Sequence, residues 1–225
     1  MSAEVSAPAR ASVGSILNPR ANEAGEQISG EQLMDWVLRG YVFSYGLLVD
    51  DGTNVPSVTT LADTTPIVSL QSPSGGDTIV VPLRVHMGVV AENSGGLSQF
   101  DIVYTKAAKD CATKLTLSGT AATGVINHLT RSPALTAQSK VLSTVTASAL
   151  TVVDSIVIAH KEIAAAILTA ATFLVDPILN YDFIDHPIAL MEGAALLLYA
   201  YTAATACEVR PSITWAEIPA SVYQP

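Results

Sequence analysis

The segment CEVRPSITWAEIPASVYQP, residues 207–225, is the most informative part of the sequence for the fold. Apolar side chains alternate there with polar or small ones: the odd positions hold Val209, Pro211, Ile213 and Trp215, and the even positions hold Arg210, Ser212, Thr214 and Ala216. Successive side chains of a β-strand point to opposite faces of the sheet. The alternation therefore predicts a strand with one buried and one exposed face. A strand so late in the chain must pair with one formed much earlier.

A second strand is expected just upstream, in GAALLLYAYTA, residues 193–203. Its nearly continuous apolar run is typical of a strand that is buried on both faces. Further upstream, apolar or alternating segments are separated by turn-forming clusters such as SPSGGD, residues 72–77. These strand candidates are residues 41–49, 66–70, 78–90, 97–106 and 114–117. Pro82 within the third of them predicts an edge position or a bulge, because proline has no N–H to donate.

The region from residue 145 to residue 175 is harder to assign. Residues 145–160 are rich in β-branched side chains and are expected to be extended. The segment KEIAAAILTAATFLV, residues 161–175, fits a helix and also fits a pair of buried strands, because periodicity does not separate the two in a short apolar run. The helix is slightly favoured, and the choice between helix and strand for residues 155–175 stays open.

The N-terminal part of the chain has a different composition. Residues 1–28 are rich in Ala, Ser, Pro, Glu and Asn, which is typical of an arm that does not fold alone. Ser29 and Gln32 form a capping-box pattern, and Gly40 suits the position after a helix, so we expect a short helix over residues 30–39. Trp36 should anchor this helix, either to its own domain or to a neighbouring subunit.

About eight strand candidates with turns between them follow residue 66, which predicts an all-β sandwich or barrel. We divide the chain into residues 1–60, with the arm, the short helix and the first strand, and residues 61–225, the main β domain. Hydrophobic residues make up 49% of the 225 residues and charged residues only 14%. So few charges cover a surface poorly, which favours burial of surface against partner subunits.

The net charge of −9 should repel phosphate backbones, so direct nucleic-acid binding is not expected. The N-terminal residues lack the apolar core of a secretory signal, and no apolar run is long enough for a transmembrane segment. Cys111 and Cys207 are expected to be free and buried, since no Cys or His cluster with metal spacing accompanies them.

The candidates for chemistry are weak. The four histidines are His86, His128, His160 and His186. His86 follows Arg84-Val85 as half of a cupin metal motif would, but it has no second histidine at residue 84 or 88. Asp185-His186 and His160-Lys161-Glu162 carry acid–base groups without a nucleophile motif beside them. Ser74–Asp77 lacks the lysine of a phosphate loop and is expected to be a tight turn. We therefore assign no catalytic, cofactor-binding or metal residue, and we expect no enzyme.

The layout resembles one known class of protein. A polar arm, a β-rich core of roughly eight strands, and the final pair GAALLLYAYTA…SITWAEIP resemble the single jelly roll of viral capsid proteins, over roughly residues 64–225. The resemblance implies an eight-stranded jelly-roll β-sandwich with an extended N-terminal arm and a short helix. The arm departs from the basic arms of small RNA-virus capsid proteins, because it carries Arg10 and Arg20 against Glu4, Glu23 and Glu26.

The same resemblance implies a function. The chain would be a virion structural protein, made in the host cytoplasm and located in the virion, which assembles with copies of itself and with other virion proteins. Its acidic balance suits an outer shell or a decoration layer that does not neutralise the genome. The alternative is a TNF-like trimeric receptor-binding module of a phage fibre or spike, whose final strands are similar. A cupin-like enzyme is a third class, and it would need a metal.

Overall fold

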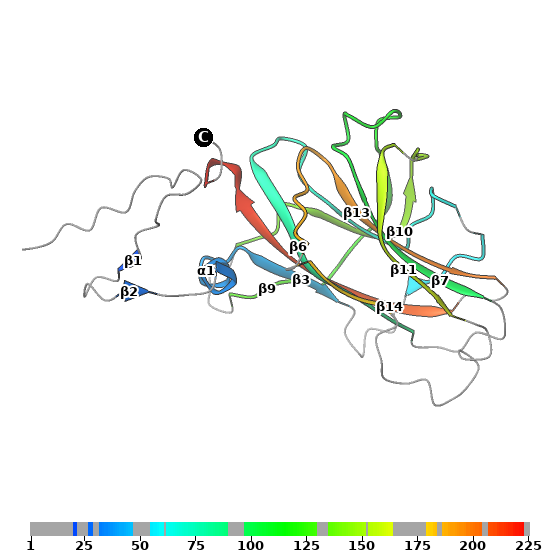
Figure 1. Ribbon diagram of the computed structural model, residues 1–225, viewed down its shortest axis with the longest axis horizontal. Helices are drawn as coiled ribbons and strands as arrows, with labels where there is room; N and C mark the ends of the chain where they lie inside the picture. Colours follow the sequence, from blue (N-terminus) through cyan, green and yellow to red (C-terminus); the bar gives the residue numbers. More distant parts are fainter. Residues whose placement is uncertain are drawn as a thin grey trace, which may run out of the picture.

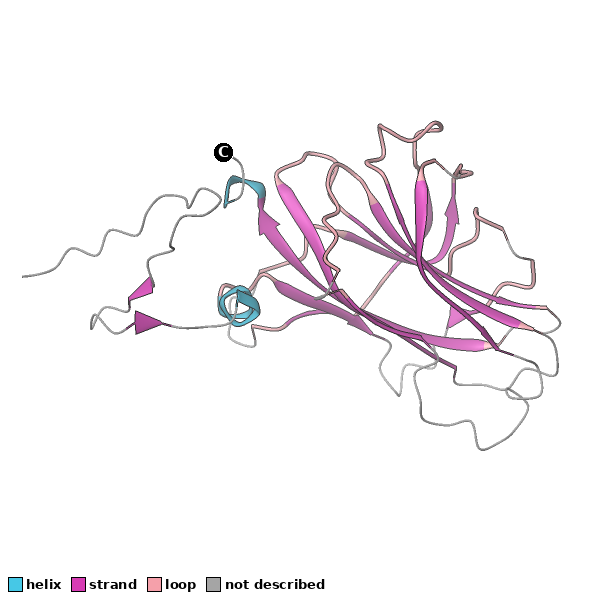
Figure 2. Cartoon of the chain, viewed as in Figure 1, coloured by secondary structure: helices cyan, strands magenta, loops and turns pink. Residues whose placement is uncertain are grey.

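The computed structural model describes residues 20–21, 27–28, 32–46, 55–60, 62–89, 97–129, 135–151, 153–163, 179–183, 186–203 and 207–222. Strands dominate these residues, and their helices are α1 (Gln32–Leu38) and a single 3₁₀ turn at Ala220–Val222 (Figure 2). The prediction of an all-β sandwich is confirmed. Each of its two antiparallel sheets has six strands, so the described sandwich is larger than the predicted eight strands.

The two sheets are named here after their central strands (Figure 1). The β13 sheet runs in the order β11 (Ser155–Ile163), β7 (Ser98–Thr105), β13 (Ala195–Thr202), β5 (Val68–Gln71), β10 (Lys140–Ala147) and β8 (Leu117–Ala121). The β14 sheet runs in the order β12 (Leu179–Asp182), β6 (Thr78–Val89), β14 (Glu208–Pro219), β3 (Val42–Gly46) and β9 (Val125–Asn127), and β4 (Val55–Pro56) also pairs with β14. A separate ribbon joins β1 (Arg20–Ala21) to β2 (Gln27–Ile28).

The strand pairs are nested in sequence. The strand β3 pairs with β14, β5 with β13, β6 with β12, and β7 with β11, all in antiparallel register. Successive pairs fall alternately in the β14 sheet and in the β13 sheet. The final strand is therefore paired with one of the first, as its alternating pattern predicted. The strands β8, β9 and β10 lie in sequence between β7 and β11, and they extend the two sheets beyond β5 and β3.

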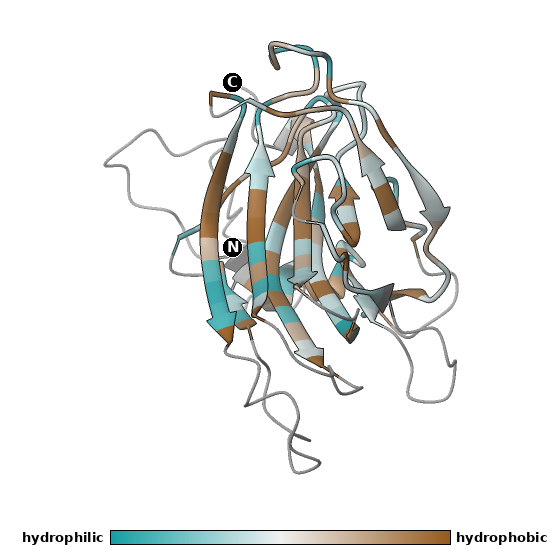
Figure 3. Cartoon of the chain, turned by 90° about the vertical axis from the view of Figure 1, so that its right-hand side faces the viewer, coloured by the Kyte–Doolittle hydropathy of each residue, from teal (hydrophilic) through white to brown (hydrophobic). Residues whose placement is uncertain are grey.

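The main core lies between the two sheets. It receives Tyr45, Met87 and Trp215 from the β14 sheet and Phe100 and Leu196 from the β13 sheet, and all five are almost completely buried. The rings of Phe43 and Trp215 stack with centroids 6.0 Å apart. In Figure 3 the brown, hydrophobic residues alternate with paler ones along the strands, as expected for strands that bury one face. The strand β13 is buried along most of its length, which confirms its prediction.

The alternation predicted for β14 holds from Val209 to Trp215 and then ends. Ala216 was expected on the exposed face, but it is fully buried. A second cluster explains the difference: Ala216 packs with Val42, Leu83 and Ile218 on the outer face of the sheet, beneath helix α1. Opposite this point Leu83 is skipped in the pairing of β6 with β14, so the bulge predicted beside Pro82 is confirmed, although β6 is an internal strand.

Helix α1 is anchored to its own sandwich. Leu33, Trp36 and Val37 pack on the buried cluster that contains Ala216. The helix ends in a Schellman motif, in which the Tyr41 N–H donates to the Trp36 carbonyl and the Gly40 N–H donates to the Val37 carbonyl, both at 2.9 Å. Gly40 has a φ of 75°, a conformation that glycine adopts without strain. The predicted capping residue Ser29 lies outside the described residues.

Two strand predictions need correction. The strand expected at residues 114–117 starts only at Leu117 and continues to Ala121, because the preceding segment turns to cover the outer face of the β13 sheet. The helix favoured from residue 161 is wrong for Lys161–Ile163, which complete β11 in register with β7. Residues 164–178 lie outside the described residues. The β-branched run of residues 145–160 is divided between β10 and β11.

We predict that Trp215→Ala lowers the free energy of unfolding by about 3–5 kcal/mol, because it removes a large, fully buried side chain from between the sheets. Urea unfolding followed by circular dichroism measures the loss. Met34→Ala is the matched control, since Met34 is 56% exposed on α1 and its truncation should change stability by less than about 0.5 kcal/mol. Equal stability of the two variants would contradict the core described here.

Candidate functional site

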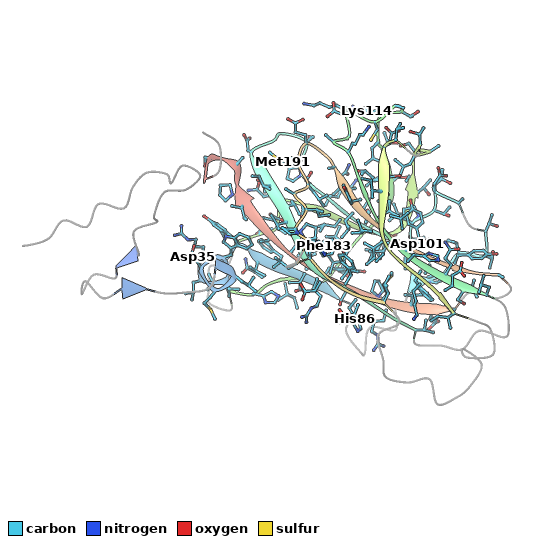
Figure 4. All side chains as sticks on the ribbon, in the orientation of Figure 1. Asp35, His86, Asp101, Lys114, Phe183 and Met191 are labelled. Atoms are coloured by element: carbon cyan, nitrogen blue, oxygen red, sulfur yellow. The ribbon has the colours of Figure 1, made fainter. Side chains whose placement is uncertain are left out.

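His86 lies in β6, and its half-buried side chain faces outward from the β14 sheet (Figure 4). Its cross-strand neighbours are Asn180 of β12 and Ser212 of β14. Burial, with a smaller contribution from the charge of Arg84, lowers the pKa of His86. Within the described part of the chain, no three His, Cys, Asp or Glu side chains are grouped so that they could hold a metal ion. The half-motif at His86 thus has no ligand partners among the described residues.

A row of polar side chains crosses the outer face of the β14 sheet. His128 Nε2 lies 2.7 Å from Ser44 Oγ, which lies 2.8 Å from Thr214 Oγ1. Across β14 from this hydroxyl pair, Arg84 contacts Asp182 at 3.4 Å. Exposed contacts of this kind contribute little to stability. The row links four strands and makes this part of the outer face polar.

A histidine cluster that sequence reasoning did not assemble lies on the outer face of the β13 sheet. His160 of β11 is paired across the strands with Asp101 of β7, and its Nδ1 lies 2.5 Å from Asp101 Oδ1. Gln99 donates to the other Asp101 oxygen at 2.7 Å, and Glu162 Oε1 lies 3.4 Å from His160 Nε2. The hydrogen bond to Asp101 raises the pKa of His160, and Glu162 adds to the effect.

This arrangement holds a proton rather than transferring one. Both ring nitrogens of His160 face carboxylates, so the protonated ring is stabilised between Asp101 and Glu162. A general base needs a ring nitrogen that is open to a substrate or to a nucleophile. We therefore interpret the cluster as a clamp that fastens β11 to β7. The sequence analysis noted His160 and Glu162 as neighbours, but Asp101 lies 59 residues from His160 and nothing in the local sequence links the two.

The remaining residues that the sequence analysis singled out lie at separate places in the fold. The turn expected at Ser74–Asp77 connects β5 to β6, with Gly76 at a φ of 74°. His186 is exposed just after a gap in the described residues, and Asp185 lies outside them. The expected core role of Trp215 is confirmed, and Trp36 packs on the β14 sheet. Cys111 and Cys207 are both free and buried, as expected. No helix in the described residues has the length and hydropathy of a membrane span.

Glu217 is a buried carboxylate near the end of β14, only 6% exposed. It accepts hydrogen bonds from the backbone N–H groups of Gln138 and Ser139 at 2.7 and 3.0 Å, and from the indole N–H of Trp215 at 3.0 Å. The hydroxyl of Ser139 also donates to it. These donors replace the water that a buried carboxylate loses. Glu217 thus fixes the segment before β10 against β14.

Beside that segment, the sandwich is open between the ends of the two sheets. A hollow of about 510 Å³ lies between β8 and β10 of one sheet and β3 and β9 of the other. Its apolar lining is mainly Phe43, Ala121, Ala122, Val125, Ala137 and Val141. Lys140 and Asn127 are among its polar residues. We call this hollow the β8–β9 groove.

The opposite side of the sandwich carries exposed apolar side chains. Val153, Ile156 and Val157 are 62%, 54% and 57% exposed on β11 and the turn before it. Among the described strands, β11 pairs only with β7. A hollow of about 410 Å³ beside it is lined by side chains that include Ile156 and Phe183. Ile156 pairs with Tyr104 and Val157 pairs with Val103, so these two consecutive side chains point to opposite faces of the β13 sheet.

The edge strand β11 carries both apolar and charged side chains. Exposed strand edges promote pairing between chains, and soluble proteins commonly protect them with charges, prolines or bulges. In β11 the charged residues His160, Lys161 and Glu162 occupy the second half of the strand, and the exposed Ile156 and Val157 occupy the first. The two open sides of the sandwich are the surfaces best suited to interaction.

Comparison with known protein families, with curated proteins and with solved structures finds no match.

We predict that the pKa of His160 lies above the ordinary value of about 6.5. Asp101→Asn should lower it, because the variant removes the anion that faces Nδ1, whereas Lys161→Gln should leave it nearly unchanged. NMR titration of the His160 ring resonances measures this pKa in the parent and in the two variants. A raised folded-state pKa stabilises the fold below the unfolded value, and this stabilisation is lost as the pH rises through the folded value. The urea concentration at the unfolding midpoint should therefore decrease as the pH is raised from about 6.5 through the raised pKa of His160. If the His160 pKa in Asp101→Asn equals that in the parent, the clamp is contradicted.

We also predict that Glu217→Ala lowers the free energy of unfolding by about 3 kcal/mol, because the buried Trp215 indole N–H and the 138–139 backbone donors lose their acceptor. Glu217→Gln keeps one side-chain oxygen as an acceptor and should lose less. Urea unfolding of the two variants gives both values. An alanine variant as stable as the parent would show that the carboxylate does not fasten this segment.

Proposed function

We propose that this chain is a virion structural protein, a jelly-roll subunit of a capsid or of a capsid-decoration layer. The nested pairing of strands is the observation that carries the proposal. A jelly roll is formed when a ribbon of four antiparallel strand pairs folds so that successive pairs fall in opposite sheets. The pairs β3–β14, β5–β13, β6–β12 and β7–β11 follow this rule. The assignment of the β-sandwich as a jelly roll is itself part of the proposal.

The eight proposed jelly-roll strands are flanked by additions. The segment between β7 and β11 contributes β8 and β10 beside β5, and β9 beside β3. These additions widen one side of the sandwich and form the β8–β9 groove. Jelly rolls occur in capsid proteins, lectins and cupins, so the fold alone does not select the function. The choice among these classes rests on the surface and on the arm.

The surface supports assembly. The chain has few charged residues and two open apolar sides, which suits a subunit that buries its sides against neighbours. Its net charge of −9 supports a layer that does not contact the genome. The ribbon β1–β2 pairs with itself and with neither sheet of the sandwich. We therefore propose that the arm, residues 1–28, reaches a neighbouring subunit.

The test is the solution mass of the protein by light scattering, with negative-stain images of the same sample. We expect assemblies several times the 23.4 kDa of the chain, and we expect them to be lost when residues 1–28 are removed. Circular dichroism of the truncated protein is the control, because the two sheets contain none of those residues. A full-length protein that stays monomeric at high concentration and at every salt concentration would overturn the proposal. A trimer that never forms a shell would favour the TNF-like receptor-binding alternative.

A further inference from the structure

Four of the five lysines of this acidic chain lie on or beside the loop that crosses the outer face of the β13 sheet from β7 to β8. All four side chains are exposed: Lys106, Lys109, Lys114 and Lys140. The first three belong to the loop itself. Lys140 begins β10, and its Nζ donates to the Leu117 carbonyl at 3.4 Å, which places it beside the start of β8. We call these four side chains the lysine patch, and Figure 4 shows Lys114 on the side of the molecule opposite His86.

The loop holds its lysines on a fixed backbone. In the segment KAAKDCATKL, residues 106–115, three side chains pack on the outer face of the β13 sheet: Ala108, Cys111 and Leu115. The Leu115 N–H donates to the Ala108 carbonyl at 3.2 Å, and this bond brings Lys109 and Lys114, which adjoin the two residues, close to each other. A ligand that binds these lysines therefore has to order side chains only, which lowers the entropy lost on binding.

The acidic side chains near the lysine patch leave part of its charge unpaired. Glu192 forms an ion pair with Lys109. Asp154 is buried, and its oxygens accept hydrogen bonds within the protein. Asp110 is exposed on the loop. Within the described part of the chain the other three lysines of the patch form no ion pair, so this surface is positive on a chain whose net charge is −9.

The chemistry of this surface points to a polyanion without bases. We propose that the lysine patch binds a sulfated polysaccharide, an inference that goes beyond the proposed function and does not depend on assembly. A lysine ammonium is a compact charge with three donors, so it can contact a sulfate oxygen from many directions. Thr113 and Thr116 are exposed between the lysines and offer hydroxyl groups to a sugar.

Two observations separate this ligand from nucleic acid and from a general attraction. Residues 106–121 contain no aromatic side chain, so the surface offers nothing on which a base could stack. The net charge of the chain repels any polyanion at long range, but at about 0.15 M salt such repulsion is screened beyond about 8 Å. Binding then depends on the lysines in direct contact with the ligand.

Surface plasmon resonance of the full-length chain over immobilised heparin tests the proposal, with unsulfated dextran as the neutral control. We expect binding to heparin at about 0.15 M salt, weakening as the salt concentration rises, because the ammonium groups release counterions from the polyanion. We expect no binding to dextran. A chain that does not bind heparin would overturn the proposal, whether or not the chain assembles.

Single substitutions locate the binding surface. Lys114→Gln and Lys140→Gln should each weaken heparin binding about fivefold, because each removes one ammonium group from the patch. Lys161→Gln removes the same charge from β11, at the other edge of the β13 sheet, and should bind like the parent. Circular dichroism checks that all three variants keep the fold. An equal loss in all three variants, or in none, would overturn the assignment to the patch.

A competition experiment distinguishes the two kinds of polyanion. Heparin and single-stranded DNA of matched total charge are added in turn to the chain bound on the heparin surface. We expect heparin to release the chain at a concentration about tenfold lower than DNA does, because DNA finds no stacking platform here. DNA that competes better than heparin, with the same loss in Lys114→Gln, would assign the patch to nucleic acid and overturn the proposal.

Discussion

The fold depends on the simultaneous pairing of β14 along both of its edges. One edge is in register with β6 from Val209 to Pro219, and the other is in register with β3 from Ser212 to Ala216. The same strand places Trp215 between the sheets and Ala216 beneath helix α1. A single strand thus holds together the N-terminal helix, the first sandwich strand and the core. Because its partners lie far away in sequence, closing these pairs costs chain entropy that only the complete core repays.

The sequence was most informative where burial is one-sided. The alternation of β14 and the continuous apolar run of β13 predicted both strands, because the water-facing and core-facing positions differ in composition. It failed at Ala216, where a helix covers the outer face and erases that difference. It also failed at Lys161–Ile163, where pairing with β7 overrides a composition that favours a helix. The Asp101–His160 contact could not be predicted, because it depends on the register between two strands.

The edge strand β11 is divided into two halves with different tasks. The half with His160 and Glu162 is fastened to β7 by the contact with Asp101, and the half with Ile156 and Val157 exposes apolar side chains on opposite faces of the sheet. A bulge between Val157 and Ala159 separates the halves and changes which face each residue occupies. Both halves are nevertheless paired with β7, so the whole strand stays in its own sheet. The opposite side of the sandwich, with the β8–β9 groove, is likewise shaped by strands added outside the nested pairs.

The place of β14 in the chain also sets an order of events during synthesis. The strands β3 and β6 leave the ribosome well before β14, and until residues 208–219 follow they are separated by the gap that β14 fills. In that interval Phe43, Tyr45 and Met87 lack the neighbour that covers them. The sheet can close only after Trp215 has been made, so a chain interrupted before that point has no finished core. The last sandwich strand therefore acts as a checkpoint, because only chains that extend through it can complete the core between the sheets.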